Sequence, residues 1–239
     1  MMEEWINEYA KDKKWSFLLD DEKRRERIHR DNYDLLISSN ETHWNEYIVI
    51  PNGETLESLF PLITVKDNPK EKKTGIYPDE QDIKSEEFWD KISEVNLELN
   101  AEEVMIWSGL VYEGFLHDFL KVYRPKSYEE YVRMISLYNG TGKENQSLPL
   151  NSDVSLDEII STKEDIYEML IMHGMPNEKA FELTAEISYG VYKNSQKREK
   201  IAEYLREYNV PDWFTNACNN ISFLATRADM VEYANKQLR

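Results

Sequence analysis

Residues 162–177, which read TKEDIYEMLIMHGMPN, carry the clearest fold signal in the sequence. Thr162 is a residue type that favours the first position before a helix, and apolar residues then recur at the spacing of one helix face. The residues expected on that buried face are Ile166, Met169, Leu170 and His173. Gly174 and Pro176 should end the helix, because glycine adopts the left-handed conformation that follows a helix and proline cannot continue one. The stretch therefore predicts a helix, a tight turn and a second helix.

Similar signals continue on both sides of this stretch. Asn177 is expected to cap the second helix. Its predicted inward residues are Ala180, Leu183, Thr184 and Ile187. Three more helices are predicted near 196–208, 211–220 and 226–238, with Trp213 buried. Upstream, Ser127 and Glu130 form a capping-box pattern ahead of an apolar helical face, and Ser85 precedes another helix. These signals predict an all-helical region from residue 85 onward.

Three segments depart from this helical pattern. Residues 1 to about 30 read as a helix interrupted near 15–19, and residues 47–50 (YIVI) read as a strand ended by the turn sequence PNG. Residues 139–154 lack periodicity and are predicted to form a loop before a second capping box at Ser155 and Glu158. We therefore predict a mainly α protein. Its predicted divisions are a small α+β segment over 1–65, a linker over 66–84 and a helical domain over 85–239.

The composition indicates an acidic globular chain. Its 239 residues include 46 acidic and 29 basic side chains, which give a formal net charge of −17 at pH 7, and 41% of the residues are hydrophobic. That length suits one or two domains with a sizeable core. The start MMEE has no apolar stretch, and no apolar run is long enough to cross a bilayer. We therefore expect no secretion signal, no membrane contact and a cytoplasmic location.

The acidity argues against the simplest nucleic-acid role, because non-specific DNA binding depends on lysines and arginines that displace counterions from phosphates. The clearest basic cluster consists of Lys23, Arg24, Arg25, Arg27 and Arg30. Such a run is more often a solvated helix or loop surface than a ligand site. It is nevertheless the main candidate for residual DNA contact.

Motifs for chemistry are sparse. The four histidines are scattered without metal-ligand spacing, and the sequence has no phosphate-binding glycine loop and no nucleophile elbow. The single cysteine, Cys218, excludes an internal disulfide framework and reads as a small core residue. We expect no metal and no cofactor.

A longer pattern runs along the last third of the sequence. It comprises Asp165-Ile166, Leu170-Ile171, Gly174, Ala180-Phe181, Val210-Pro211, Trp213, Cys218, Ile221, Ala228 and Tyr233. In this order and spacing it resembles the fingers region of PolC-type DNA polymerase III alpha subunits. The resemblance extends upstream. Its upstream positions are Arg124-Pro125-Lys126-Ser127-Tyr128, Gly140-Thr141, Thr74-Gly75-Ile76, and His43 with Ile48-Val49-Ile50-Pro51. Together the matches imply a palm edge followed by fingers.

The same resemblance implies that polymerase chemistry is lost. Where the family carries a palm aspartate on an apolar strand, this sequence has a lysine-rich interval with only Asp67. Two family positions that face the incoming triphosphate correspond to Arg227, which keeps the positive charge, and Asp229, which inverts it. A triphosphate needs several converging cations or amides. We therefore expect no catalysis, with Gly140, Thr141 and Arg227 as residual nucleotide- or DNA-binding positions.

Three functional hypotheses follow from the resemblance. The first is a truncated, non-catalytic relative that acts on replication proteins (the polymerase, its clamp or its clamp loader) as an accessory factor or a decoy, from a bacterium or a mobile element. The second is a weak DNA-binding module that uses Arg227 and the basic cluster. The third is a folded remnant without activity. The non-catalytic hypothesis predicts that Arg227 can be replaced with little effect on stability, whereas replacing a buried Trp213 should cost about 3–5 kcal/mol.

Overall fold

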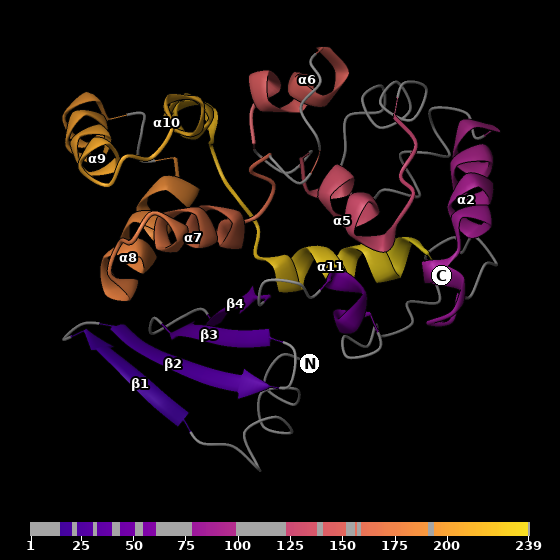
Figure 1. The fold of residues 1–239 in the computed structure, drawn as a ribbon, viewed down its shortest axis with the longest axis horizontal. Coiled ribbons are helices and arrows are strands. Elements are labelled where there is room, and N and C mark those ends of the chain that lie inside the picture. The colour runs from indigo at the N-terminus through magenta and orange to yellow at the C-terminus, as the bar shows by residue number, and fades with distance from the viewer. Residues whose placement is uncertain are drawn as a thin grey trace.

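The computed structural model describes residues 15–20, 23–30, 33–39, 44–50, 55–60, 78–98, 123–137, 141–151, 156, 159–190 and 194–238. Within this part of the chain the protein is mainly helical, with one small sheet near the N-terminus (Figure 1). The predicted helical character from residue 85 onward is confirmed there. No helix in these ranges is both long enough and apolar enough to cross a bilayer.

Four antiparallel strands form the sheet in the order β1-β2-β3-β4. Their bounds are Trp15–Asp20 for β1, Lys23–Arg30 for β2, Tyr33–Ser39 for β3 and Trp44–Val49 for β4. The register places Leu35 of β3 opposite Ile48 of β4. The strand predicted at residues 47–50 is thus confirmed as the end of β4.

The helix expected up to about residue 30 is wrong for residues 23–30, which form β2. The break predicted near 15–19 coincides with β1, and residues 1–14 lie outside the described part. Lysine, arginine and glutamate favour helices in isolation. In β2, however, the backbone pairs with β1 on one side and β3 on the other. These pairings outweigh a helix propensity of a few tenths of a kcal/mol per residue.

The helices follow the sheet. Their bounds are Leu56–Leu59 for the short η1, Asp82–Lys84 for η2, Glu86–Glu98 for α2, Tyr128–Leu137 for α5, Lys143–Asn151 for α6, Lys163–Met172 for α7, Asn177–Ser188 for α8, Ser195–Glu207 for α9, Asp212–Asn220 for α10 and Arg227–Gln237 for α11. The three helices predicted near the C-terminus are therefore confirmed as α9, α10 and α11.

The capping signals around α7 behave as predicted, whereas its predicted buried face is correct for Ile166 and Leu170 but not for Met169 and His173, which are partly exposed. Thr162 is its N-cap, and Gly174 follows it with φ +81°. The N–H of Met175 donates to the carbonyl oxygen of Leu170, and that of Gly174 to Ile171, which is the hydrogen-bond pattern of a glycine-terminated helix. The cap of α8 is Pro176 rather than Asn177. At α5, the Ser127 hydroxyl caps the helix as expected by accepting from the Glu130 N–H at 3.1 Å.

The loop expected over 139–154 is wrong, because α6 occupies residues 143–151. Its sequence, KENQSLPLN, is poor in apolar residues and contains a proline, so no helical period is visible. Tertiary contacts stabilise this helix instead: the Asn145 amide donates to the Ala217 carbonyl oxygen of α10 at 3.0 Å. The second capping box, at Ser155 and Glu158, lies outside the described residues.

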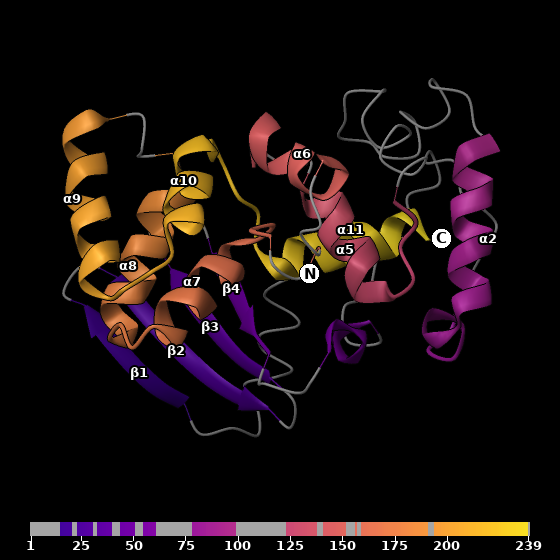
Figure 2. The same cartoon turned by 45° about the horizontal axis from the view of Figure 1, so that its top comes forward.

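Two hydrophobic cores meet at β4. The first combines Ile48 with residues of η1, α2, α5 and α11, and the second combines Tyr47 with residues of α7 to α10. Tyr47 stacks on Phe181 of α8 with ring centroids 4.8 Å apart. Figures 1 and 2 show α7 and α8 above the sheet, α11 beside β4, and α2 at the far side of the molecule. One strand therefore joins both groups of helices, whereas the predicted division at residues 66–84 stays a prediction.

Candidate functional site

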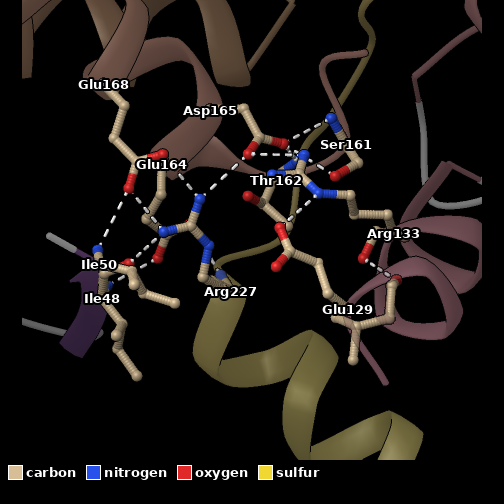
Figure 3. A network of polar contacts seen from close by, with 12 residues as sticks. Ile48, Ile50, Glu129, Arg133, Ser161, Thr162, Glu164, Asp165, Glu168 and Arg227 are labelled. Carbon is tan, nitrogen blue, oxygen red and sulfur yellow. Dashed lines mark hydrogen bonds and ion pairs between the residues drawn. The ribbon is translucent and has the colours of Figure 1, made fainter. Parts of the chain in front are cut away.

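The first two turns of α7 carry three acidic residues, Glu164, Asp165 and Glu168, that meet other elements. Asp165 accepts hydrogen bonds through Oδ2 from the N–H groups of Ser161 and Thr162, both at 2.7 Å, and so closes the N-terminus of its own helix. Glu164 and Glu168 point instead toward β4 and α11 (Figure 3). The helix start thus presents carboxylates to its neighbours.

Arg227, the first residue of α11, lies among these carboxylates. Its Nη1 and Nη2 atoms donate to the two oxygens of Glu168 at 2.6 and 2.8 Å, a bidentate pair, and Nη2 also donates to Oδ1 of Asp165 at 3.1 Å (Figure 3). A further bond runs from Nη1 to the Ile48 carbonyl oxygen at 2.7 Å. The Arg227 side chain is only 4% exposed. Its guanidinium is therefore held on the inside of the protein.

Glu164 joins β4 to the start of α11. Its Oε1 accepts from the Ile48 N–H and its Oε2 from the Arg227 N–H, each at 2.8 Å. Glu168 additionally accepts from the Ile50 N–H at 3.3 Å. The edge of β4 that faces away from β3 is thereby paired with side chains rather than with another strand. This arrangement satisfies the backbone groups of an edge strand that would otherwise be open.

Arg133 ties α5 into the same network. Its Nε donates to Glu129 at 3.1 Å and its Nη1 to Oδ1 of Asp165 at 3.3 Å. Asp165 therefore accepts from two arginines that belong to helices far apart in the sequence. We call Arg133, Glu164, Asp165, Glu168 and Arg227 the ion network.

The members of the ion network differ in the direction of their pKa shifts. Burial raises the pKa of the Glu164 carboxyl to about 8, although Arg227 and the backbone N–H groups oppose the rise. Burial would also raise the pKa of Asp165, but Arg133, Arg227 and two N–H donors lower it to about 2. For Arg227, burial works to lower the pKa, and the three carboxylates around it hold the pKa above its ordinary value. Arg227 and Asp165 are therefore firmly charged, while Glu164 titrates near neutral pH.

A carboxylate also occupies the N-terminus of α11. Asp229 accepts through Oδ2 from the Thr226 hydroxyl at 2.7 Å and from the Thr226 N–H at 3.3 Å. Together with Glu164 on the Arg227 N–H, it fills positions where a helix N-terminus attracts an anion. The end of α11 is consequently surrounded by negative charge of the protein itself.

A second enclosed cation is Lys163, the first residue of α7. Lys163 is 1% exposed. Its Nζ lies 4.6 Å from the ring centroid of Tyr189 and 5.7 Å from that of Phe223, within cation–π range. The Nζ also contacts the Tyr189 hydroxyl at 3.4 Å. Aromatic rings thus cover this lysine from solvent.

The remaining site residues predicted from sequence lie elsewhere. Thr141 is fully buried, and its hydroxyl donates to the Leu137 carbonyl oxygen, which gives it a structural contact at the end of α5. Gly140 lies outside the described residues. The five basic-cluster residues all belong to β2, and β3 separates β2 from the strand that Arg227 contacts. The structure does not bring the basic cluster and Arg227 together.

The ion network itself was missed by sequence reasoning. Its only signal was the run of acids at positions 164, 165 and 168, where 164 and 168 share a helix face. Arg133 carried no signal, because its partner Asp165 lies 32 positions away.

A groove of about 770 Å³ lies between α6, α7 and α10. Its apolar lining consists of Leu148, Met169, Met172, Pro211, Trp213 and Ala217. Met172 is 72% exposed and Trp213 is 44% exposed. The expectation that Trp213 is buried is therefore wrong: α10 turns Phe214, Ala217 and Cys218 inward instead.

In the described ranges, no cluster of three or more histidine, cysteine or acidic side chains is arranged to hold a metal ion. Cys218 is buried, and burial raises the pKa of its thiol above the ordinary value. The prediction that Cys218 is a core residue is confirmed.

Comparison with known proteins connects the chain to one group of enzymes. No family model matches the sequence. Curated relatives include the DNA polymerase III PolC-type of Lactococcus lactis, 27% identical over 121 residues, and that of Thermotoga maritima, 33% identical over 128 residues. These matches cover 48% and 52% of this chain but only 7% and 9% of the relatives. The protein of Caldanaerobacter subterraneus is 29% identical over 122 residues, or 8% of its length. Over about half of its length, the chain is thus a divergent relative of PolC-type DNA polymerase III, as the motifs predicted.

Proposed function

We propose that this chain acts in or on DNA replication through contacts with replication proteins, as a non-catalytic accessory factor or decoy. Its relatives are named as DNA polymerases, and it matches less than a tenth of their length. In this proposal the chain corresponds to the palm edge and the fingers of the polymerase. It keeps the apolar residues that pack the helices but has lost the residues that bind phosphate. The sheet takes the place of the palm edge.

One observation carries the proposal: the charge around the start of α11 is negative. Arg227, the cation retained at a family position that faces the triphosphate, is engaged by Glu168 and Asp165. A triphosphate at this place would have to displace both carboxylates and approach Asp229 as well. Like charges at contact distance in a partly buried site cost several kcal/mol. The site therefore favours holding α11 in place over binding a nucleotide.

The catalytic part of the proposal is tested with the purified chain. Primer extension with Mg²⁺ and deoxynucleotides should give no product, and calorimetry should show no heat of deoxynucleotide binding. Extension activity that survives rigorous purification would overturn the non-catalytic assignment.

The contact part is tested with purified replication proteins. The immobilised chain is incubated separately with a PolC-type polymerase, a sliding clamp and a clamp loader from the same host, at physiological salt. One of the three should be retained at a defined stoichiometry. Retention of none of them contradicts the contact role and leaves the inactive remnant as the better description.

Weak DNA binding is the second candidate, because β2 gathers the basic cluster within eight consecutive residues. This candidate predicts that labelled DNA binds at low salt and dissociates steeply as salt rises. It also predicts that the double variant Arg25→Gln/Arg27→Gln loses this binding. A salt-independent signal, or one unchanged in that variant, speaks against it.

A further inference from the structure

The groove between α6, α7 and α10 has firmly held walls. The Asn145 amide of α6 donates to the Ala217 carbonyl oxygen of α10 at 3.0 Å, and the Asn220 amide of α10 donates to Oε2 of Glu144 at 2.6 Å. Gly142, with φ +91°, lies so close to Asn220 that a Cβ there would be 2.5 Å from the backbone oxygen. These contacts hold α6 and α10 at a fixed spacing, so this side of the groove is a preformed feature of the surface.

The apolar side chains at its rim are of the kind that bind partners. Met172 and Trp213 are among the four large hydrophobic residues that are exposed in the described part of the chain. Tryptophan dominates many interface energies, and the flexible, polarisable methionine adapts to different apolar surfaces. The groove volume of about 770 Å³ suits a few side chains from one face of a helix rather than a whole folded surface.

The charges around the groove select its occupant. Its lining includes the carboxylate of Glu144 and the imidazole of His173 but neither lysine nor arginine. Asp212, exposed, lies next to Trp213 in the sequence, and the whole chain carries a net charge of −17. Two copies of so acidic a chain repel each other, whereas a basic segment is attracted over several ångströms. The complementary partner is apolar on one face and basic on its flanks.

We propose that this groove is the docking site for a basic amphipathic helix of a partner protein. Apolar side chains of that helix enter between Met172 and Trp213, and its lysines or arginines lie beside Glu144 and Asp212. The inference rests on the proposed function, since it assigns a surface and a partner class to the contact role.

The test uses the full chain and a defined probe. The probe is a labelled 18-residue peptide with leucines at helical i, i+3, i+4 and i+7 spacing and lysines elsewhere, and its binding is followed by fluorescence anisotropy. Met172→Ala and Trp213→Ala should each weaken binding about tenfold. The matched control is Phe223→Ala, which removes an aromatic ring of similar exposure (41% against 44%) outside the groove lining and should leave affinity unchanged. Circular dichroism verifies that each variant is folded.

Charge is tested on both sides of the interface. Replacing the peptide lysines by glutamates should abolish binding, and Asp212→Asn should weaken binding of the lysine peptide and reduce its salt dependence. Equal binding of both peptides, or unchanged affinity in Met172→Ala and Trp213→Ala, overturns the proposal. A concentration-dependent dimer that Trp213→Ala dissociates also overturns it, because the occupant is then a second copy.

The peptide assay contains no replication protein, so its outcome is independent of the retention assay above. A chain that retains a replication protein but not the peptide keeps the proposed function and loses this inference. A chain that binds the peptide through Trp213 but retains no replication protein keeps the docking site and loses the replication role.

Discussion

Arg227 donates to Glu168, to Asp165 and to the Ile48 carbonyl oxygen while almost none of its side chain reaches solvent. The same residue type can bind a phosphate or lock a fold, and neighbouring carboxylates decide between the two. The sequence showed the retained charge at position 227, and the structure adds the two carboxylates that pair with it. The earlier expectation that Arg227 is dispensable for stability therefore loses its basis.

Replacing Arg227 should be costly. Arg227→Met removes the bidentate partner of Glu168 and one of the two arginines that contact Asp165, so the free energy of unfolding should fall by about 3–5 kcal/mol in urea denaturation. The matched change Lys200→Met, at an exposed position of α9, should alter stability by no more than about 0.5 kcal/mol. Equal effects of the two changes would show that the ion network does not stabilise the protein.

Glu164 should make stability depend on pH. Its pKa is about 8 in the folded chain against an ordinary value of 4.5, so between these pH values the folded state binds more protons than the unfolded state. Its contribution to the free energy of unfolding is therefore full below pH about 4.5 and is lost as the pH rises toward 8. Asp165 acts with the opposite sign, but only between pH about 2 and 3.8.

The measurement compares the original chain with Glu164→Gln in urea denaturation at pH 5, 6, 7 and 8. The stability difference between the two should shrink as the pH rises. At pH 5 the variant should be less stable by about 1–3 kcal/mol, because its amide group presents a donor to a backbone N–H. A difference that is constant over this range excludes Glu164 as the titrating group.

The tryptophans offer a comparison of burial at the single-residue level. Trp89 is fully buried and donates from Nε1 to the Ile83 carbonyl oxygen at 2.8 Å, whereas Trp213 is 44% exposed and has an edge-to-face contact with Phe214. Trp89→Ala should cost about 3–5 kcal/mol and Trp213→Ala about 1 kcal/mol or less. Thermal denaturation of both variants measures this, and comparable losses would contradict the exposure of Trp213.

At the scale of elements, side chains of α7 pair with the outer edge of the sheet, at β4. Its carboxylates accept from the free edge of β4, so no fifth strand is needed to satisfy those backbone groups. The spacing of Glu164 and Glu168, one helical turn apart, matches Ile48 and Ile50, which lie two residues apart on the same strand edge. A helix here replaces the hydrogen-bonding role of a strand.

The contact of α6 with α10 depends on Gly142. Gly142→Ala would place a Cβ 2.5 Å from the Asn220 backbone oxygen, in a positive-φ conformation. Gly174 also has positive φ, but a Cβ there would have no neighbour within 4 Å. Gly174→Ala should therefore cost about 1–2 kcal/mol from backbone strain alone, and Gly142→Ala clearly more. Chemical denaturation compares them, and the reverse order would show that α6 does not pack tightly on α10.

The elements also show what a sequence can predict. The start of α7 at Thr162 and its end at Gly174 were predicted correctly, because capping and glycine conformations are decided within a few residues. By contrast, β2 is built from helix-favouring residues, and α6 contains a proline and few apolar positions. Contacts distant in sequence determine both, as they determine the position of Arg227. The exposure of Trp213 was missed for the same reason, since several faces of α10 are apolar.

For the whole molecule, β4 is the shared element. Ile48 belongs to the first core and Tyr47 to the second, so a substitution that disrupts one core should also destabilise the other. Ile48→Ala should cost about 2–5 kcal/mol. In both the original chain and this variant, far-UV circular dichroism and tryptophan fluorescence should report one coincident unfolding transition. Two separate transitions would instead support independent units divided near the predicted linker.

The bond between Arg227 and Ile48 joins positions 179 residues apart. On the ribosome, at about 5–20 residues per second, β4 emerges roughly 10 to 40 seconds before its last partner is synthesised. The Ile48 N–H has no partner until Glu164 is made, 116 residues later, and the Ile48 carbonyl oxygen waits for Arg227 at the end of the interval. A stalled polypeptide that stops short of α7 is therefore a candidate for chaperone capture, because none of the side chains that pair with this edge of the sheet has been made.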